Sequence, residues 1–241
     1  MTVTITHCIF DMDGLLLDTE RIYTEATQKV LDECVPGTRF TWELKSQLMG
    51  RTAVESAQIV VEALNLPLTV DEYINTLTEK QAKMWSSCEV LPGVASLIKH
   101  LKAHNIPIAV ATSSTRAKYE LKTARHQELF ALFDSVTCGD DGDVARGKPA
   151  PDIFLTAKRK IGDPPSEKCL VFEDAWAGVE AARTAGMHVV WIPDPNMLKI
   201  YEDGKKVESA QEGEVVEPTE VMVTMAAFDP VKFALPPFIK T

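Results

Sequence analysis

Two carboxylates one residue apart stand near the start of the chain, where they follow a short apolar run. Asp11 and Asp13 come directly after Cys8–Phe10, and Gly14 follows them. Such a run indicates a buried parallel strand, and open α/β sheets bind ligands at the carboxyl ends of their strands. Two acids in one crevice repel each other, so the site needs a cation or a shared proton. The pattern therefore favours a carboxylate nucleophile that takes a phosphoryl group, beside an acid/base and a magnesium ion, over a solvated turn.

A second apolar run, 108–111, ends in three hydroxyl residues, Thr112, Ser113 and Ser114, before an expected helix. Hydroxyls and backbone N–H groups at the start of a helix bind phosphate oxygens well. Serine and threonine also favour the N-cap position, where they bind only the backbone of their own helix. On the residues alone, a phosphate site and a simple helix cap are equally open.

A lysine lies in a stiff loop further along the chain, in the sequence Gly147-Lys148-Pro149-Ala150-Pro151-Asp152. The two prolines restrict the approach to the next helix, which Asp152 is expected to cap. Lys148 offers a point charge to a phosphate or to the nucleophilic carboxylate. The alternative is an ordinary solvated lysine. The loop is not a Walker motif, because it lacks the glycine-rich phosphate loop.

Two further acids, Glu173 and Asp174, end a third apolar run, Cys169–Phe172. Magnesium prefers an octahedron of oxygen ligands, of which waters and a substrate phosphate supply part. Asp11, the backbone carbonyl of Asp13 and Asp174 are the expected protein ligands. Glu173 is expected to bind the ion directly or through water. Each acid pair alone is compatible with a surface feature, but strand ends that carry acid, hydroxyl, lysine and acid in turn favour one common site.

The elements that must position these residues alternate between strand and helix patterns. This alternation predicts a parallel sheet with helices on both faces. The fold class is therefore α/β, with a Rossmann-like parallel sheet as the core. The predicted strands are 4–10, 106–111, 133–138, 168–172 and 188–193, and the predicted helices are 93–104, 115–130, 152–161 and 176–185.

The gap between the first two predicted strands is too long for one crossover connection. Residues 19–87 have the pattern of several helices, of which 54–64 and 70–84 are the clearest. We therefore expect a small helical domain inserted into a core domain of residues 1–18 and 88–241. The alternative is a set of extra helices packed on the core.

The C-terminal segment is first charged and then apolar. Residues 203–219 carry charges and glycines, and they are expected to form an exposed loop or a loose hairpin. The run Val221–Val223 predicts a final edge strand. Four apolar side chains are then expected to tie the tail to the body: Phe228, Phe233, Leu235 and Phe238.

Bulk composition excludes some classes of partner. The 241 residues carry a formal net charge of −10 and show no basic stripe of the kind that nucleic-acid-binding proteins use. An acidic protein is also repelled by anionic membranes, and no apolar run reaches the roughly 18–20 residues of a membrane helix. We therefore expect a small-molecule partner without nucleic acid or membrane, and a monomer as the default for this size.

The five cysteines are scattered without metal-like pairs. Cys8, Cys138 and Cys169 lie in apolar runs, which predicts that they are buried as small hydrophobic residues. Their odd number and the lack of a signal peptide predict a reducing, cytoplasmic setting. The five histidines also lack metal-ligand spacing and are interpreted as structural or exposed.

The four strand-end sites resemble the four motifs of the haloacid dehalogenase (HAD) superfamily of phosphohydrolases, and the helical insert resembles its type 1 cap domain. The resemblance implies hydrolysis of a small phosphomonoester through an aspartyl-phosphate. It implies that Asp11 is the nucleophile and Asp13 the general acid/base. It further implies that Thr112 binds the phosphoryl group and that Lys148 pairs with this group and with the nucleophile. The Mg²⁺ ligands that it implies are Asp11, Asp13, Asp174 and Glu173.

Longer stretches resemble the pseudouridine-5′-phosphatase group of this superfamily. They include 10–21, 122–126, 152–155 and 167–175, and in the insert 49–51 and 55–58. The likeness implies pseudouridine 5′-phosphate as substrate, with glycerol phosphate, 2-deoxyglucose 6-phosphate and other sugar phosphates still open. The chain departs from this group at Ala150, where aspartate is frequent, at Trp176, where proline is frequent, and in the longer 203–219 segment. Trp176 follows the proposed metal ligands, so it is a candidate to alter the mouth of the site.

Residues in the insert are expected to select the substrate. Arg51 is a candidate for a polar contact with it, and Ser113 and Ser114 for its phosphate; an exposed arginine at a helix start is the alternative. Mutases of the β-phosphoglucomutase type carry a histidine ten residues after the acid/base, where this chain has Tyr23. Tyrosine does not easily handle protons near neutral pH, so a mutase is a less favoured alternative. A binding protein without catalysis is less favoured again, because the acids and Lys148 are all present.

Overall fold

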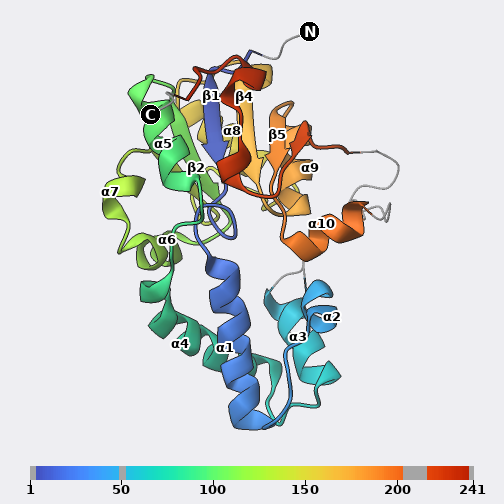
Figure 1. Ribbon diagram of the computed structural model, residues 1–241. Helices are drawn as coiled ribbons and strands as arrows, with labels where there is room; N and C mark the ends of the chain where they lie inside the picture. The colour runs from blue at the N-terminus through green and yellow to red at the C-terminus, as the bar shows by residue number, and fades with distance from the viewer. Residues whose placement is uncertain (1–3, 49–52, 203–215, 239–241) are drawn as a thin grey trace. The chain divides into compact units, whose positions relative to one another are not determined.

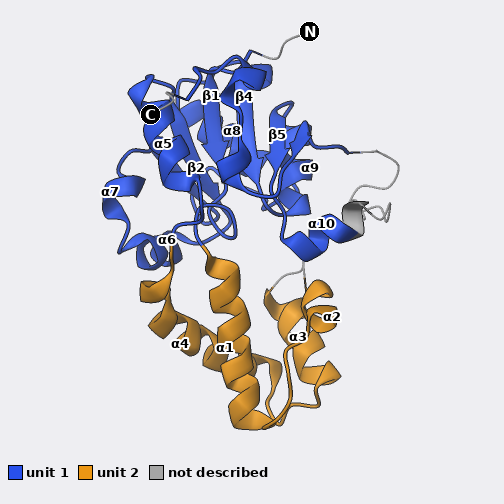
Figure 2. Cartoon of the chain, viewed as in Figure 1, with its two compact units in different colours: residues 1–17, 90–241 blue, residues 18–89 orange. Residues whose placement is uncertain are grey.

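The computed structural model describes residues 4–48, 53–202 and 216–238. The chain divides into two compact units, which Figure 2 shows in different colours. Unit 1 comprises Met1–Leu17 and Val90–Thr241, and unit 2 comprises Asp18–Glu89. Unit 2 thus begins one residue before, and ends two residues after, the helical insert expected at 19–87.

Unit 1 is built on a parallel sheet with the strand order β3-β2-β1-β4-β5-β6. The predicted strands are confirmed with bounds that differ by up to three residues, and the edge strand starts one residue and ends two residues earlier than expected. The strands are β1 His7–Phe10, β2 Ile108–Thr112, β3 Ser135–Cys138, β4 Cys169–Glu173, β5 His188–Trp191 and β6 Glu220–Val221 (Figure 1). The register sets Phe10 level with Val110 and Phe172, so the chain leaves β1, β2 and β4 at the same edge of the sheet.

The helices of unit 1 follow the strands. Those expected at 93–104, 152–161 and 176–185 are confirmed to within one residue. A further helix, α10, follows β5 and had no counterpart among the predicted elements. The helices are α5 Val94–Ala103, α6 Arg116–Thr123, α7 Gln127–Phe130, α8 Asp152–Lys160, α9 Trp176–Thr184 and α10 Pro195–Glu202, with short 3₁₀ turns at Ser166–Lys168, Met225–Ala227 and Pro230–Phe233.

The single helix predicted at 115–130 is wrong, because the structure breaks it into α6 and α7. The Thr123 hydroxyl donates to the carbonyl of Tyr119 at 2.8 Å, and the His126 N–H donates to the carbonyl of Thr123 at 2.8 Å. A hydroxyl that bonds back to the preceding turn competes with the helical backbone, and the tight turn that follows ends α6. No glycine or proline marks this break in the sequence.

Alternate strand residues fill two apolar layers, one on each face of the sheet. Ile9, Val171 and Trp191 belong to the layer covered by α8 and α9. Phe10 and Phe172 point to the opposite face, where their rings stack with centroids 4.6 Å apart. Both faces of the sheet are therefore buried. This packing holds the strands in place, and with them the residues at their carboxyl ends.

The C-terminal tail packs on the second of these layers. Phe228 lies edge-on to Phe172, with ring centroids 4.9 Å apart, and Phe233 and Leu235 are buried as expected. Phe238 also contacts the body, because its ring lies beside that of His100 in α5 at 4.5 Å between centroids, although the residue is 38% exposed. Most of the expected 203–219 loop lies outside the described residues.

The regular secondary structure in the described part of unit 2 is helical. Its elements are α1 Thr19–Cys34, α2 Trp42–Ser46, α3 Ala53–Ala63, α4 Val70–Met84 and the 3₁₀ turn Trp85–Ser87. The helices predicted at 54–64 and 70–84 are confirmed. A capping box of Thr69 and Glu72 starts α4, and Leu31, Val60 and Tyr73 lie in the apolar core of the unit.

The cysteines follow the sequence expectation. Cys8, Cys138 and Cys169 are buried, Cys88 is buried with them, and all five thiols are free. They act as small hydrophobic residues in the packed interior. Separately, none of the helices in the described part of the chain has the length and apolar character required to span a membrane.

Candidate active site

Lys148 joins two of the strand-end acids in unit 1. Asp11, which follows β1, is buried, and its Oδ1 lies 2.5 Å from Lys148 Nζ. The same ammonium pairs with Glu173 at the end of β4 and lies 4.9 Å from the centre of the Phe154 ring. The Lys148 side chain is only 8% exposed. The interpretation of Lys148 as a solvated lysine is therefore wrong.

The charges in this group do not balance. Burial, together with the charges of Glu173 and Asp13, raises the pKa of Asp11 to about 7, although the attraction of Lys148 lowers it. Burial also disfavours the charge on Lys148, but the two carboxylates outweigh it and raise the pKa of the lysine. Lys148 is therefore a cation at neutral pH that several acids share. The remaining negative charge favours a bound cation.

A second lysine holds the second acid. Asp13 Oδ1 lies 2.5 Å from Lys122 Nζ, and Asp13 Oδ2 accepts hydrogen bonds from Ser114 Oγ at 2.8 Å and Thr112 Oγ1 at 3.2 Å. Lys122 Nζ also donates to Ser114 Oγ at 2.9 Å. Lys122 lies in the last turn of α6, and its side chain is completely buried. No spacing pattern marked Lys122 in the sequence, because most lysines in helices are solvated.

The hydroxyl loop after β2 faces the second acid and does not cap α6. Thr115 caps that helix, since its side chain accepts a hydrogen bond from the backbone N–H of Lys118. Thr112 Oγ1 accepts from the Ser114 N–H at 3.1 Å while it donates to the acid. Ser113, the third candidate, has an exposed side chain. The helix-cap interpretation therefore does not apply to these three residues.

The loop after β3 supports the hydroxyl loop from one side. The Gly139 N–H donates to the carbonyl of Ser114 at 3.0 Å. An ideal Cβ on Gly139 would lie 2.5 Å from the carbonyl oxygen of Ser113. Only glycine allows two backbones to approach this closely. The two loops are thus held together by main-chain contacts.

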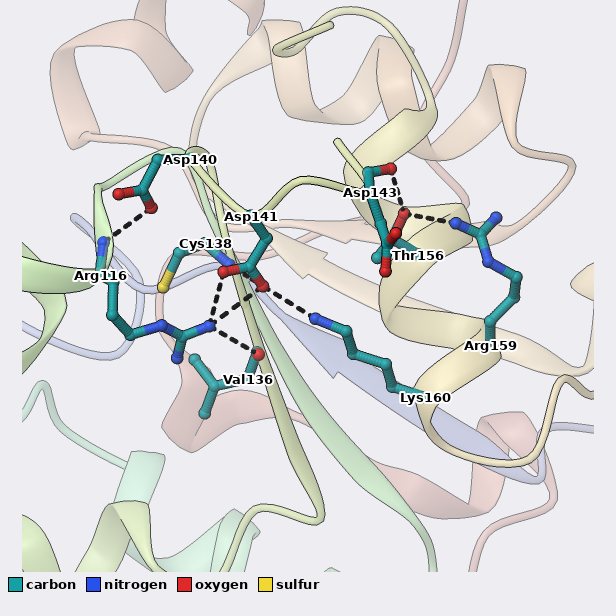
Figure 3. Close-up of polar contacts among 9 residues, drawn as sticks. All are labelled: Arg116, Val136, Cys138, Asp140, Asp141, Asp143, Thr156, Arg159 and Lys160. Atoms are coloured by element: carbon teal, nitrogen blue, oxygen red, sulfur yellow. Dashed lines mark hydrogen bonds and ion pairs between the residues drawn. The ribbon is translucent and has the colours of Figure 1, made fainter. Parts of the chain in front are cut away.

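Asp141 anchors the loop after β3 (Figure 3). Its carboxylate accepts hydrogen bonds from the Arg116 guanidinium at 2.8 and 3.0 Å and from Lys160 Nζ at 2.8 Å. Burial would raise the pKa of Asp141, but these hydrogen bonds and a bond from the Cys138 N–H lower it to about 2. Cys138, Asp140 and Asp141 lie close enough together to hold a metal ion. Because two cations already neutralise Asp141, we assign no metal to this cluster.

Glu173 is completely buried, and each of its oxygens has a protein partner. Oε1 pairs with Lys148, and Oε2 accepts a hydrogen bond from the Ala175 N–H at 3.0 Å. Gly178 of α9 leaves the space for this carboxylate, because an ideal Cβ there would overlap it. Asp174 is half-buried, and its carbonyl accepts a hydrogen bond from the Trp191 indole at 2.8 Å.

Three acids form a group that fits a hard divalent cation. The ligand atoms of Asp11, Glu173 and Asp174 all lie within 4.8 Å of one another. The three side chains offer only oxygen ligands, as Mg²⁺ requires, and Lys148 is the cation that pairs with two of them. Both Glu173 oxygens have protein partners, so Glu173 would have to give up one of them to bind an ion directly.

Other sequence expectations have mixed outcomes. Asp152 does not cap α8, because Pro151 occupies the cap position and Asp152 is the first helical residue. Its carboxylate accepts hydrogen bonds from the backbone and guanidinium of Arg146 at 3.2 Å. Trp176 packs edge-on against Trp191, with ring centroids 5.0 Å apart. Arg51 lies outside the described residues.

The chain is similar to known proteins over most of its length. The family described as haloacid dehalogenase-like hydrolase matches residues 8–192. A probable pseudouridine-5′-phosphatase of Drosophila melanogaster is 43% identical over 236 residues, which cover 97% of this chain and 96% of the relative. (DL)-glycerol-3-phosphatase 2 of Arabidopsis thaliana is 43% identical over 239 residues, which cover 98% of this chain and 93% of the relative. The crystal structure of a putative β-phosphoglucomutase from Thermotoga maritima matches with a TM-score of 0.69 and 28% identity, over 92% of this chain and 95% of that one.

Proposed function

Because the chain belongs to the haloacid dehalogenase-like hydrolases and is a phosphoric monoester hydrolase by its similarity to their phosphatases, we propose that it hydrolyses a small phosphomonoester with Mg²⁺ through an aspartyl-phosphate. One observation carries this proposal. Asp11 lies against Lys148 within a group of acids at one edge of the sheet, and such a group offers the nucleophile, the cation and the metal ligands that this reaction would need.

Asp11 is the proposed nucleophile. Lys148 holds its Oδ1, and no residue in the described ranges donates a hydrogen bond to Oδ2, so this oxygen is available to react. Oδ2 attacks phosphorus as the bond from phosphorus to the leaving oxygen breaks and the leaving oxygen keeps the electron pair. Asp13, which carries a proton before this step, gives that proton to the leaving oxygen and becomes a carboxylate. The products of this step are a free alcohol and a phosphoryl group on Asp11.

Asp13 then acts as the base. It takes a proton from a water molecule whose oxygen attacks the phosphorus. The bond between phosphorus and Oδ2 breaks, and its electron pair returns to Asp11. Inorganic phosphate leaves, and both acids are back in their starting protonation states.

Positive charge and hydroxyl donors offset the charge of the transferring group. Ser113 is proposed to donate its hydroxyl to the phosphate oxygens, and Lys148 to pair with them. Thr112 and Ser114, whose hydroxyls donate to Asp13 in this structure, are proposed to turn toward the phosphate oxygens when Asp13 is protonated. Asp11, Asp174 and the backbone carbonyl of Asp13 would hold Mg²⁺, which when bound acts as a Lewis acid on a phosphoryl oxygen. Glu173 supports this arrangement by fixing Lys148, and it is a further candidate ligand.

Pseudouridine 5′-phosphate is the proposed substrate. The alternatives are glycerol phosphate and other sugar or polyol phosphates such as 2-deoxyglucose 6-phosphate. Relatives named for the first two substrates are both 43% identical to the chain, so overall identity does not choose between them. Arg51, outside the described residues, stays the sequence-based prediction for a substrate contact. Release of inorganic phosphate from a panel of these esters will separate the alternatives.

A mutase of the β-phosphoglucomutase type is the less favoured alternative. Tyr23 stands where such a mutase has its histidine, and the Tyr23 ring lies edge-on to Trp85, with centroids 5.3 Å apart. The panel tests this alternative as well. Steady phosphate release from a monophosphate, without a bisphosphate primer, would exclude a mutase as the main activity, whereas strict dependence on the primer would favour it.

Asp11→Asn tests the proposed mechanism. The amide is nearly isosteric but is a poor nucleophile, so we expect kcat for phosphate release to fall on the order of 10⁴-fold or more while the protein stays folded. Asp143→Asn, at an exposed aspartate, is the control and should keep the wild-type rate. An Asp11→Asn protein that kept most of the wild-type rate would rule out an aspartyl-phosphate at this residue.

A further inference from the structure

Lys122 places a buried ammonium group against the acid that is proposed to move protons. The residue is 1% exposed, and its Nζ lies 2.5 Å from Asp13 Oδ1 and 2.9 Å from Ser114 Oγ. Buried ion pairs are seldom the most stabilising choice at a position, because apolar residues of similar volume pack there about as well. The ammonium group therefore suggests a role beyond stability.

Asp11 and Asp13 form ion pairs with different lysines. Lys148 approaches Asp11 from the loop before α8, whereas Lys122 approaches Asp13 from α6. The two carboxylates are one residue apart, so a single shared cation would draw them to one point. Separate cations hold the two carboxylates apart. Asp11 stays beside the other proposed metal ligands, and Asp13 stays beside the hydroxyl loop.

Three donors fix the orientation of the Asp13 carboxylate. Lys122 occupies Oδ1, and the hydroxyls of Ser114 and Thr112 occupy Oδ2. The hydroxyl groups can rotate and can also accept hydrogen bonds, but the ammonium of Lys122 can only donate. Lys122 also holds Ser114, so it sets the position of one of the other two donors.

We propose that Lys122 is a positioning residue that holds Asp13 in line for proton transfer and does not itself touch the substrate. This inference rests on the proposed function, because Asp13 moves protons only in that mechanism. The Lys122 side chain is completely enclosed, with Asp13 and Ser114 against its Nζ, so a substrate phosphate is kept from it. A proton donor that is free to turn loses rate even when its chemistry is unchanged.

The leaving group of the substrate provides the first test. p-Nitrophenolate departs without a proton, whereas an alkoxide needs one. In Lys122→Met we expect the first turnover of p-nitrophenyl phosphate to slow by less than about threefold, and that of the best alkyl phosphate of the panel to slow by about 10- to 100-fold. Rapid-quench measurement of alcohol release in the first turnover gives both values. An equal loss with both esters would overturn the proposal.

A double variant provides the second test. If Lys122 acts through Asp13, then Lys122→Met combined with Asp13→Asn will be no slower with the alkyl phosphate than Asp13→Asn alone. Losses that multiply would show that Lys122 has a separate role and would overturn the proposal. The inhibition constant for inorganic phosphate should change less than about threefold in Lys122→Met. Removal of a group that binds phosphate directly would raise this constant tenfold or more.

Two further variants serve as controls. Lys118→Met removes an exposed lysine from the same helix and should leave all rates unchanged. Lys122→Gln keeps a hydrogen-bond donor without the charge, and it replaces the methionine variant if that protein fails to fold. Failure of the proposed function is recognised separately, because then the wild type would hydrolyse no ester or Asp11→Asn would stay active. If the wild type hydrolyses an ester and Asp11→Asn is inactive, the proposed function stands. An equal loss with both esters in the Lys122 variant would then overturn the positioning role alone.

Discussion

Glu173 carries a charge into a fully buried position, and its neighbours make this possible. Lys148 pairs with one oxygen, the Ala175 N–H donates to the other, and Gly178 leaves the space that the carboxylate fills. Lys148 in turn orients Asp11. The geometry of the proposed nucleophile therefore depends on a glycine in α9 that does not touch it.

Gly178→Ala tests this dependence, because it adds a single methyl group beside the Glu173 carboxylate. The added Cβ would displace the Glu173 carboxylate and with it Lys148, so kcat should fall at least about tenfold. Alanine is otherwise favoured over glycine in a helix by about 1 kcal/mol, so the backbone itself would not account for a loss. Phosphate release and thermal unfolding are the measurements. Gly142→Ala, where a Cβ meets nothing within 4 Å, is the matched control. Unchanged kinetics in Gly178→Ala would contradict the placement of Glu173.

Most of the residues that meet at the sheet edge were recognisable from sequence because each ends or follows an apolar run. This holds for Asp11, Thr112 and Glu173, whose positions follow from strands alone. Lys148 was a weaker prediction, since only its stiff loop distinguished it from a solvated lysine. Lys122 was not recognisable, because the turn of α6 that directs its amine inward depends on how the helix packs and leaves no pattern in the sequence.

Among the elements, the loop after β3 and the start of α6 behave as one piece. Asp141 ties Arg116 of α6 to Lys160 of α8, and Gly139 lies against the hydroxyl loop. The hydroxyl groups beside Asp13 thus depend on ion pairs that lie outside the site. The network stabilises the folded protein as long as Asp141 is ionised.

The pH dependence of stability tests this network. The pKa of Asp141 is lowered from 3.8 to about 2 in the folded protein, so its contribution is complete above about pH 4 and is lost as the pH falls through 2. A shift of this size corresponds to roughly 2 kcal/mol, of which about half is gone at pH 3. Urea unfolding of Asp141→Asn should therefore show a deficit of ~2 kcal/mol at pH 7 and a smaller one at pH 3.

Asp143→Asn is the matched control for this measurement, since its side chain is exposed in the same loop region. It should change the free energy of unfolding by less than ~0.5 kcal/mol at either pH. A deficit in Asp141→Asn that stayed constant between pH 7 and pH 3 would show that the carboxylate is not stabilised as an ion.

Secondary structure was predictable where the sequence carries a boundary signal. The strand runs and α5, α8 and α9 have such signals, and they lie close to their expected bounds. The break between α6 and α7 has none, because Thr123 ends the helix through a side-chain bond to its own backbone. Asp152 shows the converse error, since a favourable cap residue lies one position inside the helix and bonds to Arg146.

At the scale of the whole molecule, the chain carries a net negative charge, and acidic side chains also gather at the candidate site. The formal net charge is −10, and three carboxylates lie together at the sheet edge. An anionic substrate would be repelled from this edge without a compensating cation. The binding of a divalent cation should therefore affect the stability of the folded protein as well as its activity.

Magnesium titration tests this coupling. Mg²⁺ at ten times its dissociation constant should stabilise the wild type by about 1.4 kcal/mol, which raises the midpoint of thermal unfolding by roughly 3–6 °C. Chelation with EDTA should abolish phosphate release, and added Mg²⁺ should restore it. Asp174→Asn removes a proposed ligand, so its midpoint should respond less to the ion. An equal response in both proteins would move the cation away from Asp174.

The order of the strands in the sheet could not be predicted from the sequence. Alternating patterns predict parallel strands, but they do not state which strands are neighbours. The structure places β1 between β2 and β4, although about 100 and 160 residues separate it from them along the chain. Sequence therefore identified the reactive positions, and tertiary pairing decided which of them meet.

The free cysteines have a practical consequence. Cys8, Cys138 and Cys169 belong to unit 1 and are all buried. An alkylating reagent can reach these thiols only when the surrounding packing opens. The rate at which these three thiols are labelled therefore measures how often unit 1 opens, and no probe has to be added to the chain.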